Sequence, residues 1–191
     1  FKRFDKYHEM KKFLLIFLTY SILFLSNIVK SEDTGELVEI YLINQIDEQR
    51  GYCIDIKGYK LKAKVNRGIQ AHTCYSYQKQ IAVDQGFDRK KIMNNQFFLP
   101  GFNVCMEASS IVVPGKLFLK DCNLRDVQKF ILMNDGRISL VSNKKLCLTA
   151  SQGKSRKGGG GSPVHLIRSL LLQLCSDKVM NYQKWNIRSD Q

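Results

Sequence analysis

Short apolar runs alternate with turn-forming residues along most of the chain after residue 35. The first run, residues 37–43, is rich in β-branched residues and lies between Gly35 and the polar pair Asn44-Gln45. Such runs, bounded by turn residues, are typical of β-strands. The triplet Asn134-Asp135-Gly136 is a hairpin signal between two later runs. The pattern therefore predicts an all-β protein, with further strands at 117–119, 130–132 and 138–141.

The amino-terminal part has a different pattern, a nearly continuous apolar run over residues 13–29. Lys11 and Lys12 precede it, and a polar stretch begins at Lys30. A basic segment, an apolar segment and a polar exit are typical of a secretory signal peptide. We expect residues 1–31 to be a signal peptide with an upstream extension, and residues 32–191 to be an exported domain, secreted or periplasmic, with no membrane span left after cleavage. An uncleaved membrane anchor is the less favoured alternative.

The cysteines agree with export, because all six lie in the predicted exported domain. An even number of cysteines behind a signal peptide indicates disulfides. None of them has C-x-x-C spacing, which argues against a zinc ribbon or a thioredoxin-like site. Six cysteines allow fifteen pairings, so their number alone does not give the connectivity. They are Cys53, Cys74, Cys105, Cys122, Cys147 and Cys175.

One sequence unit occurs three times. Each copy begins with a cysteine, an apolar residue and a polar residue, continues to a second cysteine, and ends with glutamine, any residue and an aromatic residue. Three copies of one unit indicate an internal repeat, and many short strands in repeated units favour a closed antiparallel architecture. The opening triplets start at Cys53, Cys105 and Cys147, and the closing motifs are Gln85-Gly86-Phe87, Gln128-Lys129-Phe130 and Gln183-Lys184-Trp185.

Two stretches of the third unit need separate interpretation. Residues 165–175 carry leucines at every fourth position, which permits a helix, but the repeat favours a strand there. Residues 151–162 read SQGKSRKGGGGS, with four consecutive glycines next to basic residues. The spacing of a phosphate-binding P-loop is absent. We therefore expect a flexible surface loop inserted in the third unit.

The repeated units resemble the ricin-type (ricin B-like) lectin β-trefoil over about residues 36–189. The resemblance implies twelve strands that form a six-stranded barrel and a hairpin cap, with threefold pseudo-symmetry. It implies that each unit closes its own disulfide, which gives Cys53–Cys74, Cys105–Cys122 and Cys147–Cys175. It also implies that the three motif aromatics, Phe87, Phe130 and Trp185, pack in the shared core.

The resemblance also implies where a sugar would bind. In this family an acid is the third residue of the opening triplet. An aromatic plate lies two residues before the second cysteine, and a polar residue lies four residues before it. A polar pair stands at the closing motif. The chemistry fits, because carboxylates and amides accept hydrogen bonds from sugar hydroxyls and a ring covers the apolar sugar face. In the first unit these positions hold Asp55, Gln70, His72, Asp84 and Gln85. His72 is a smaller plate than the usual aromatic residue.

The other two units lack parts of this set. In the second unit Glu107 keeps the acid, but Lys120 replaces the plate and Val127 replaces a polar residue. In the third unit Thr149 replaces the acid and Gln173 replaces the plate. We therefore expect one carbohydrate pocket, in the first unit. The three motif glutamines occur even in the degraded units, which favours a structural role for them.

The function predicted is that of a carbohydrate-binding module for a galactose-type or other glycan. The chain is expected to be a monomer without enzymatic activity, since it has no Gly-x-Ser-x-Gly or His-Glu-x-x-His motif and the repeat accounts for every cysteine. No cofactor, metal or nucleic acid is expected. The net charge of +13 leaves two alternatives open: a basic trefoil that binds anionic glycans or other polyanions by charge, or a protein-interaction scaffold. The basic residues in question are Lys57, Lys60, Lys62, Lys64, Arg89, Lys90 and Lys91.

Overall fold

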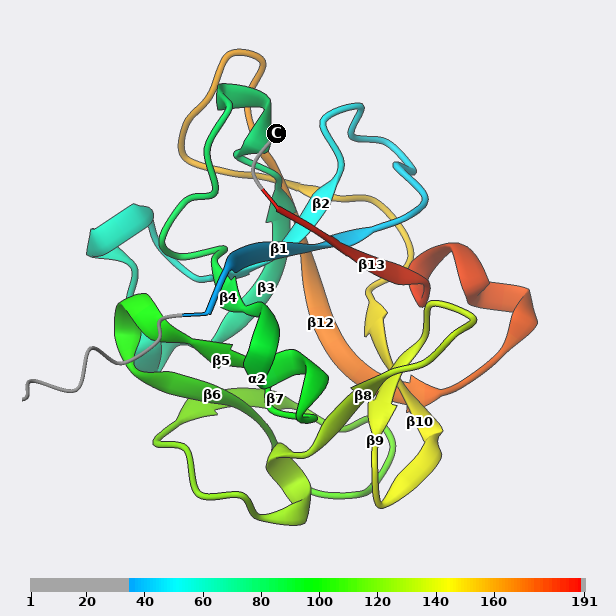
Figure 1. Cartoon of the computed structure of the whole chain (residues 1–191). Coiled ribbons are helices and arrows are strands. Elements are labelled where there is room, and N and C mark those ends of the chain that lie inside the picture. The colour runs from blue at the N-terminus through cyan, green and yellow to red at the C-terminus, as the bar shows by residue number, and fades with distance from the viewer. Residues whose placement is uncertain (1–34, 190–191) are drawn as a thin grey trace, which may run out of the picture. The chain divides into compact units, whose positions relative to one another are not determined.

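The computed structural model describes residues 35–189 as an almost entirely β-stranded unit (Figure 1). The predicted signal peptide, residues 1–31, lies outside the described residues. The strands are β1 (Leu37–Leu42), β2 (Tyr52–Ile56), β3 (Ile69–Thr73), β4 (Phe87–Asp88), β5 (Phe98–Leu99), β6 (Val104–Ala108), β7 (Leu117–Lys120), β8 (Phe130–Leu132), β9 (Ile138–Leu140), β10 (Asn143–Ala150), β11 (Arg156–Lys157), β12 (Leu166–Leu174) and β13 (Trp185–Arg188).

Helical structure in residues 35–189 is confined to short turns. The α-helix α2 (Arg89–Met93) follows β4, and the Asp88 side chain caps it by accepting a hydrogen bond from the Lys91 backbone N–H at 2.9 Å. The 3₁₀ turns are η1 (Lys60–Lys62), η2 (Val65–Arg67), η3 (Ser76–Gln78), η4 (Pro100–Phe102), η5 (Asp126–Gln128) and η6 (Asp177–Tyr182).

The strands form three similar units of four. They are β1 to β4, β5 to β8, and β9, β10, β12 and β13. In each unit the middle two strands form a hairpin: β2 with β3, β6 with β7, and β10 with β12. The tight connection between β8 and β9 contains Gly136 at φ +87°, a conformation that favours glycine, as the hairpin signal predicts. This arrangement is the predicted β-trefoil.

Strand pairing between units closes the fold. β1 pairs antiparallel with β13, so that Glu39 faces Arg188 and Leu42 faces Trp185. β3 of the first unit pairs with β12 of the third, with His72 opposite Ile167. The second of these pairings brings the residues just before β12 next to the first unit.

The three motif aromatics lie in one core. Phe87, Phe130 and Trp185 are all fully buried, as the repeat predicts. The Phe97 ring lies between the first two, with ring centroids 6.4 Å from Phe87 and 5.9 Å from Phe130. Trp185 also donates its indole N–H to the Leu148 carbonyl at 3.0 Å. Burial of one such ring stabilises the fold by about 1.5–3 kcal/mol, so these rings supply a large share of the core.

The structure refines two predictions for the third unit. Residues 166–174 form strand β12, not a helix, because residues 170–174 pair with β10 and residues 167–169 pair with β3. The inserted loop at 151–162 is not a plain surface loop. It contains β11, a thirteenth strand, which pairs with the start of β12 through Arg156–Ile167 and Lys157–Leu166. The insertion is therefore held against the fold on one side.

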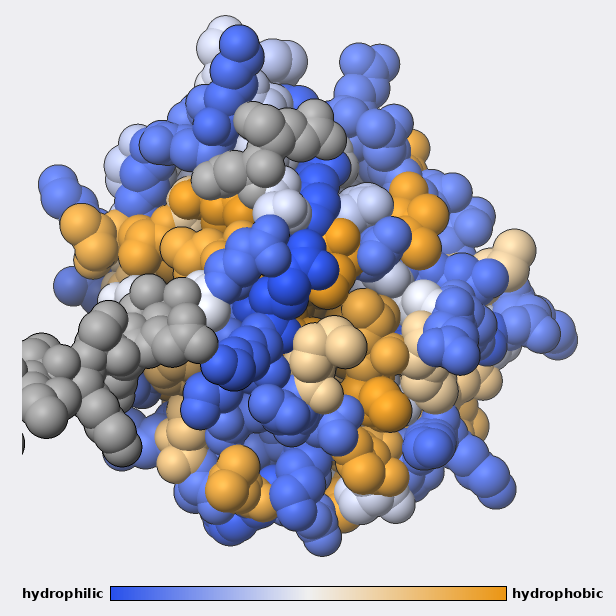
Figure 2. Space-filling model, in the orientation of Figure 1, coloured by the Kyte–Doolittle hydropathy of each residue, from blue (hydrophilic) through white to orange (hydrophobic). Residues whose placement is uncertain are grey.

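Hydrophilic side chains cover most of the face seen in Figure 2, and apolar residues form separate areas among them. Along β7 the alternation is regular: Leu117 and Leu119 are buried, whereas Phe118 and Lys120 face outward. None of the helices in residues 35–189 is long and apolar enough to cross a membrane.

Candidate functional site

The hairpin of each unit brings the family's ligand positions together on paired strands. The plate position lies opposite the first cysteine: His72 opposite Cys53, Lys120 opposite Cys105 and Gln173 opposite Cys147. The acid position lies opposite the other polar position: Asp55 opposite Gln70, Glu107 opposite Phe118 and Thr149 opposite Leu171. The four positions thus have the same register in all three hairpins, and different side chains occupy them.

The structure pairs each unit's two cysteines with one another. The disulfides are Cys53–Cys74, Cys105–Cys122 and Cys147–Cys175, and none of the six cysteines is free. These are the pairings that the resemblance implies. Each disulfide ties the first strand of a hairpin to the residue that follows the second strand or lies just beyond it, so it fixes the base of that unit's candidate pocket.

The motif glutamine has the same role in all three units. Its oxygen accepts the backbone N–H of the residue after the second cysteine, and its amide donates to the carbonyl of the residue before that cysteine. Gln85 binds Tyr75 N (2.9 Å) and Thr73 O (3.1 Å), Gln128 binds Asn123 N (2.9 Å) and Asp121 O (2.9 Å), and Gln183 binds Ser176 N (2.9 Å) and Leu174 O (3.0 Å). We call this arrangement the glutamine clamp. The clamp agrees with the structural role that the repeat favours for Gln85, whose oxygen and one of whose two amide hydrogens are bound to the backbone.

In the second and third units the acid position is already bonded within the protein. The Glu107 carboxylate accepts hydrogen bonds from Arg125 Nη2 at 2.9 Å and from Gln128 Nε2 at 2.8 Å. The Thr149 hydroxyl donates to the Cys147 carbonyl and accepts from Gln183 Nε2, both at 2.9 Å. In both units, protein donors therefore already bind this position, at Glu107 Oε2 in the second unit and at the Thr149 hydroxyl in the third.

The first unit differs, because its two acids are buried without matching donors. Asp55 and Asp84 are both fully buried. Within residues 35–189, neither Asp55 oxygen nor Asp84 Oδ1 has a hydrogen-bond partner, whereas Asp84 Oδ2 accepts the Lys60 backbone N–H at 2.6 Å. Burial raises the Asp55 pKa well above its usual value, and the nearby charge of Asp84 raises it further. The amides of Gln70 and Gln85 act in the opposite direction on this pKa, without reaching hydrogen-bond geometry.

His72 covers this acid pair. Its Nδ1 lies 2.9 Å from the Thr73 carbonyl and 3.5 Å from Asp55 Oδ2. Since a carbonyl only accepts, Nδ1 carries the hydrogen and Nε2 carries the lone pair. Burial lowers the pKa of His72 to about 4, so the ring is neutral at pH 7. The expected open plate is not what the structure shows, because only 5% of His72 is exposed.

A cluster of rings closes the site above His72. The His165 ring lies 5.0 Å from His72 and 5.3 Å from Tyr75, and Tyr75 is itself buried beside His72. Two tyrosines at the margin of the cluster are accessible: Tyr59 is 56% exposed and Tyr77 is 45% exposed. Tyr59 meets Tyr75 edge-on, and the Tyr77 hydroxyl lies 3.1 Å from His165 Nε2. The accessible rings at this site are thus tyrosines.

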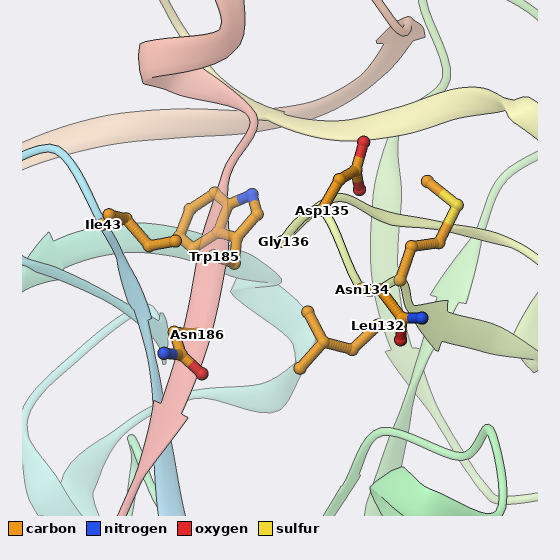
Figure 3. Close-up of a pocket in the computed structure, with 8 residues that line it drawn as sticks. Ile43, Leu132, Asn134, Asp135, Gly136, Trp185 and Asn186 are labelled. Carbon is orange, nitrogen blue, oxygen red and sulfur yellow. The ribbon is translucent and has the colours of Figure 1, made fainter.

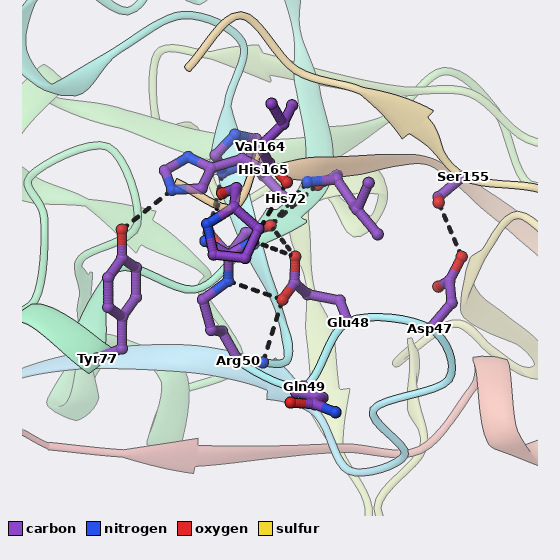
Figure 4. Close-up of polar contacts among 12 residues, drawn as sticks. Asp47, Glu48, Gln49, Arg50, His72, Tyr77, Ser155, Val164 and His165 are labelled. Carbon is purple, nitrogen blue, oxygen red and sulfur yellow. Dashed lines mark hydrogen bonds and ion pairs between the residues drawn. The ribbon is translucent and has the colours of Figure 1, made fainter. Parts of the chain in front are cut away.

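Arg50 holds the segment that carries His165 (Figure 4). Arg50 donates to the carbonyls of Pro163 at 2.9 Å and Val164 at 3.2 Å, and its guanidinium is paired with the buried Glu48 at 2.7 Å. Glu48 also accepts the Thr73 hydroxyl at 2.7 Å. Sequence reasoning missed Arg50, Glu48 and the position of His165. Glu48 and Arg50 lie more than a hundred residues before His165, and the pairing of β3 with β12 that brings them together has no local sequence signal.

A pocket lies elsewhere on the protein, away from this site. It is a pocket of about 200 Å³ beside the β8–β9 turn and the start of β13 (Figure 3). None of the five first-unit candidates lines it. The lining residues are Ile43, Leu132, Met133, Asn134, Asp135, Gly136, Trp185 and Asn186.

Residues 35–189 contain one group with the spacing of metal ligands, formed by Glu39, Cys53 and Cys74. The two sulfurs are bonded to each other, so they offer no thiolate. Buried Glu39 is instead paired with the Arg188 guanidinium. This group is therefore accounted for by a disulfide and an ion pair.

No model of a protein family matches the chain, and no curated protein matches its sequence. Solved structures do match. The mdaA-1 domain has a TM-score of 0.59 at 15% identity and covers 80% of this chain and 89% of that chain. The C-terminal half of an earthworm R-type lectin, solved with GalNAc, has a TM-score of 0.53 at 13% identity, covering 81% and 99%. The Vibrio vulnificus hemolysin/cytolysin β-trefoil lectin, solved with N-acetyl-D-lactosamine, has a TM-score of 0.50 at 12% identity, covering 82% and 96%. At these identities the likeness shows the fold, so the chain has the β-trefoil fold of R-type lectins.

Proposed function

We propose that the protein is a carbohydrate-binding module with one site, in the first unit. The observation that carries the proposal is the contrast between units: Glu107 and Thr149 are bonded within the protein, whereas Asp55 is buried without a hydrogen-bond partner among residues 35–189. A buried acceptor that lacks a donor is costly, by about 1–3 kcal/mol or more for a charged group. A ligand rich in hydroxyl groups supplies the missing donors.

In the proposed site the two acids accept hydrogen bonds from the sugar, and the aromatic rings contact its apolar face. Asp55 and Asp84 accept hydrogen bonds from neighbouring hydroxyls of one sugar, and Gln70 borders them from β3. His72 moves off Asp55 and places its ring against the apolar face of the sugar. Tyr59 and Tyr77 are exposed rings at the margin that extend this apolar surface. Gln85 supports the site from behind through its clamp.

Two of the structural neighbours support a glycan as the ligand. The earthworm lectin was solved with GalNAc and the Vibrio lectin with N-acetyl-D-lactosamine. A galactose-type sugar is therefore the first ligand to test. We also propose that the module acts outside the cell, as an exported monomer, in agreement with its three disulfides.

A glycan array followed by titration tests the proposal. Binding at a single shallow site is expected at millimolar to high micromolar Kd, about 4–6 kcal/mol. Asp55→Asn removes the charge of one acceptor, and because a hydrogen bond to a charged group contributes about 1.5–3 kcal/mol, affinity should fall at least tenfold. Glu107→Ala and Thr149→Ala are the matched changes in the other units and should leave the titration unchanged. Equal binding by Asp55→Asn and the wild type would refute the site.

Charge-driven binding of an anionic glycan is the second candidate. The observation that favours it is a basic loop beside the site. The Lys60 backbone N–H donates a hydrogen bond to Asp84, and the nearby Lys62 and Lys64 are exposed. Such binding weakens steeply as salt rises, whereas hydrogen bonding and ring contact with a neutral sugar change little. If Lys62→Glu with Lys64→Glu abolishes binding and Asp55→Asn does not, this candidate replaces the first.

A further inference from the structure

The glycine-rich insertion of the third unit reaches the candidate site of the first unit. Residues 158–161 are four consecutive glycines, and the segment that they begin ends at His165, whose ring lies on His72 and Tyr75. His165 is 6% exposed, so it fills the space above His72. A residue of one unit thus closes the site of another.

The contacts of this segment are concentrated at its two ends. On one side β11 pairs with the start of β12. On the other, Arg50 donates to the carbonyls of Pro163 and Val164. Between them, two backbone hydrogen bonds close the loop on itself: Gly158 N to the His165 carbonyl at 2.7 Å and His165 N to the Gly160 carbonyl at 2.8 Å. Arg50 therefore ties the first unit to the two residues just before His165, and the Tyr77 hydroxyl contacts His165 itself at 3.1 Å.

The glycines leave room for the His165 ring. A methyl group added at Gly161 would overlap the ring, whereas one added at Gly159 or Gly160 would meet nothing within 4 Å. Gly161 also has φ +92°, a conformation that side-chain-bearing residues rarely adopt. The closed position of His165 thus depends on the absence of a side chain at Gly161.

We propose that residues 158–165 form a gate over the acid pair of the first unit, with His165 as the part that blocks entry and Arg50 as the latch. The gate rests on the proposed carbohydrate site for its ligand. In the closed state Asp55 stays without a hydrogen-bond donor, and Asp84 Oδ1 likewise. In the open state His165 leaves His72, and His72 can move away from Asp55. Only the open fraction of the protein molecules can bind a ligand, so a larger closed fraction weakens the apparent affinity.

Chemical modification of His72 tests the gate without any sugar. His72 is neutral at pH 7 and its Nε2 carries a lone pair, so diethyl pyrocarbonate acylates it whenever the ring is reachable. The full chain is treated at pH 7, and peptide mapping gives separate rates for His8, His72 and His165. Gly161→Ala displaces the His165 ring and should raise the His72 rate about tenfold, the change expected if the open population rises by that factor.

Two alanine substitutions serve as controls. Gly160→Ala adds the same methyl group one residue earlier, where it meets nothing. Gly153→Ala adds it at φ +82°, again in open space, and so reproduces the backbone strain without the overlap. Both should leave the His72 rate at the wild-type value. His165→Ala removes the ring altogether and should raise the His72 rate in the same way as Gly161→Ala, with no change of loop backbone.

The outcomes separate the gate from the sugar site. A raised His72 rate in Gly161→Ala and His165→Ala, with unchanged controls, supports the gate, and tighter glycan binding by the same variants supports it further. An unchanged His72 rate in His165→Ala overturns the gate even if the wild type binds glycans. A raised His72 rate with no glycan bound by any variant supports the gate and removes the proposed carbohydrate function.

Discussion

Gln183 donates a hydrogen bond to the hydroxyl of Thr149 at 2.9 Å, and Gln128 makes the corresponding contact with the Glu107 carboxylate at 2.8 Å. Both glutamines also clamp the chain around the second cysteine of their units. The clamp is therefore present in units whose acid positions are bonded within the protein. It therefore explains why the glutamine occurs in all three copies of the repeat without any reference to sugar.

The clamp predicts a stability effect that is similar in different units. Gln128→Ala and Gln183→Ala each leave a backbone N–H and a carbonyl without their partner in a largely buried place. Each substitution should lower the free energy of unfolding by about 1–3 kcal/mol. Urea denaturation followed by tryptophan fluorescence measures it. Gln152→Ala, on the exposed insertion, is the control and should change stability little. A clamp variant as stable as this control would show that the clamp contributes nothing.

Trp185→Phe should be destabilising although phenylalanine stands at the equivalent positions of the other units. The substitution removes the indole N–H that the Leu148 carbonyl accepts at 3.0 Å in the core. Because phenylalanine is smaller than tryptophan, the substitution also leaves a cavity where the fully buried Trp185 ring packs. The unsatisfied carbonyl alone is expected to cost about 1–3 kcal/mol. Thermal unfolding monitored by circular dichroism measures the loss, and an unchanged midpoint would contradict the assigned role of the indole.

His72 predicts an acid-sensitive fold. Its pKa is about 4 in the folded state and 6.5 when unperturbed, so between these values the unfolded chain binds the proton more readily. Stability contributed by neutral His72 is complete above pH 6.5 and is lost as the pH falls toward 4, up to about 3 kcal/mol. Burial lowers the pKa of His165 as well, which acts in the same direction. Denaturant titrations at pH 4.5 and pH 7 measure the difference.

A neutral residue at position 72 should reduce this pH dependence. His72→Gln keeps an N–H near the Thr73 carbonyl and does not titrate. Its stability should fall less than that of the wild type between pH 7 and pH 4.5. If the variant and the wild type lose equal stability over this range, another group is responsible for the acid sensitivity.

Asp55 acts in the opposite direction. Its pKa is raised, so the folded state binds the proton more readily, and its contribution to stability is lost as the pH rises from 3.8 through the folded-state pKa. Asp55→Asn removes a buried ionisable carboxyl beside Asp84, and with it the cost of ionising that group in the core, so the variant should be more stable at pH 7 than the wild type. Asp126→Asn, at an exposed carboxylate paired only with Lys129, is the control. A destabilised Asp55→Asn would mean that the folded protein needs the charge.

The features that repeat in every unit could be predicted from the sequence, and the contacts of the single insertion with another unit could not. The repeated cysteines and the Gln-x-aromatic motif identified the three units, and the family resemblance that they carry implied the disulfides and the core rings. The burial of His72 could not be predicted, because His165, which covers it, follows it by more than ninety residues. The role of Arg50 depends on the same long-range pairing of β3 with β12. A periodic pattern specifies which face of a strand is buried, but not which neighbouring strand will bury it.

The pairing of β1 with β13 has a consequence for how the chain can be rearranged. Because Glu39 lies opposite Arg188 in antiparallel register, the chain enters and leaves the domain at the same edge. A short linker can therefore join the two ends, and new ends can be opened in a connecting loop such as the one between β8 and β9. The position of the chain ends then decides the order of the three units in the sequence. A circular permutant can therefore begin with any of the three.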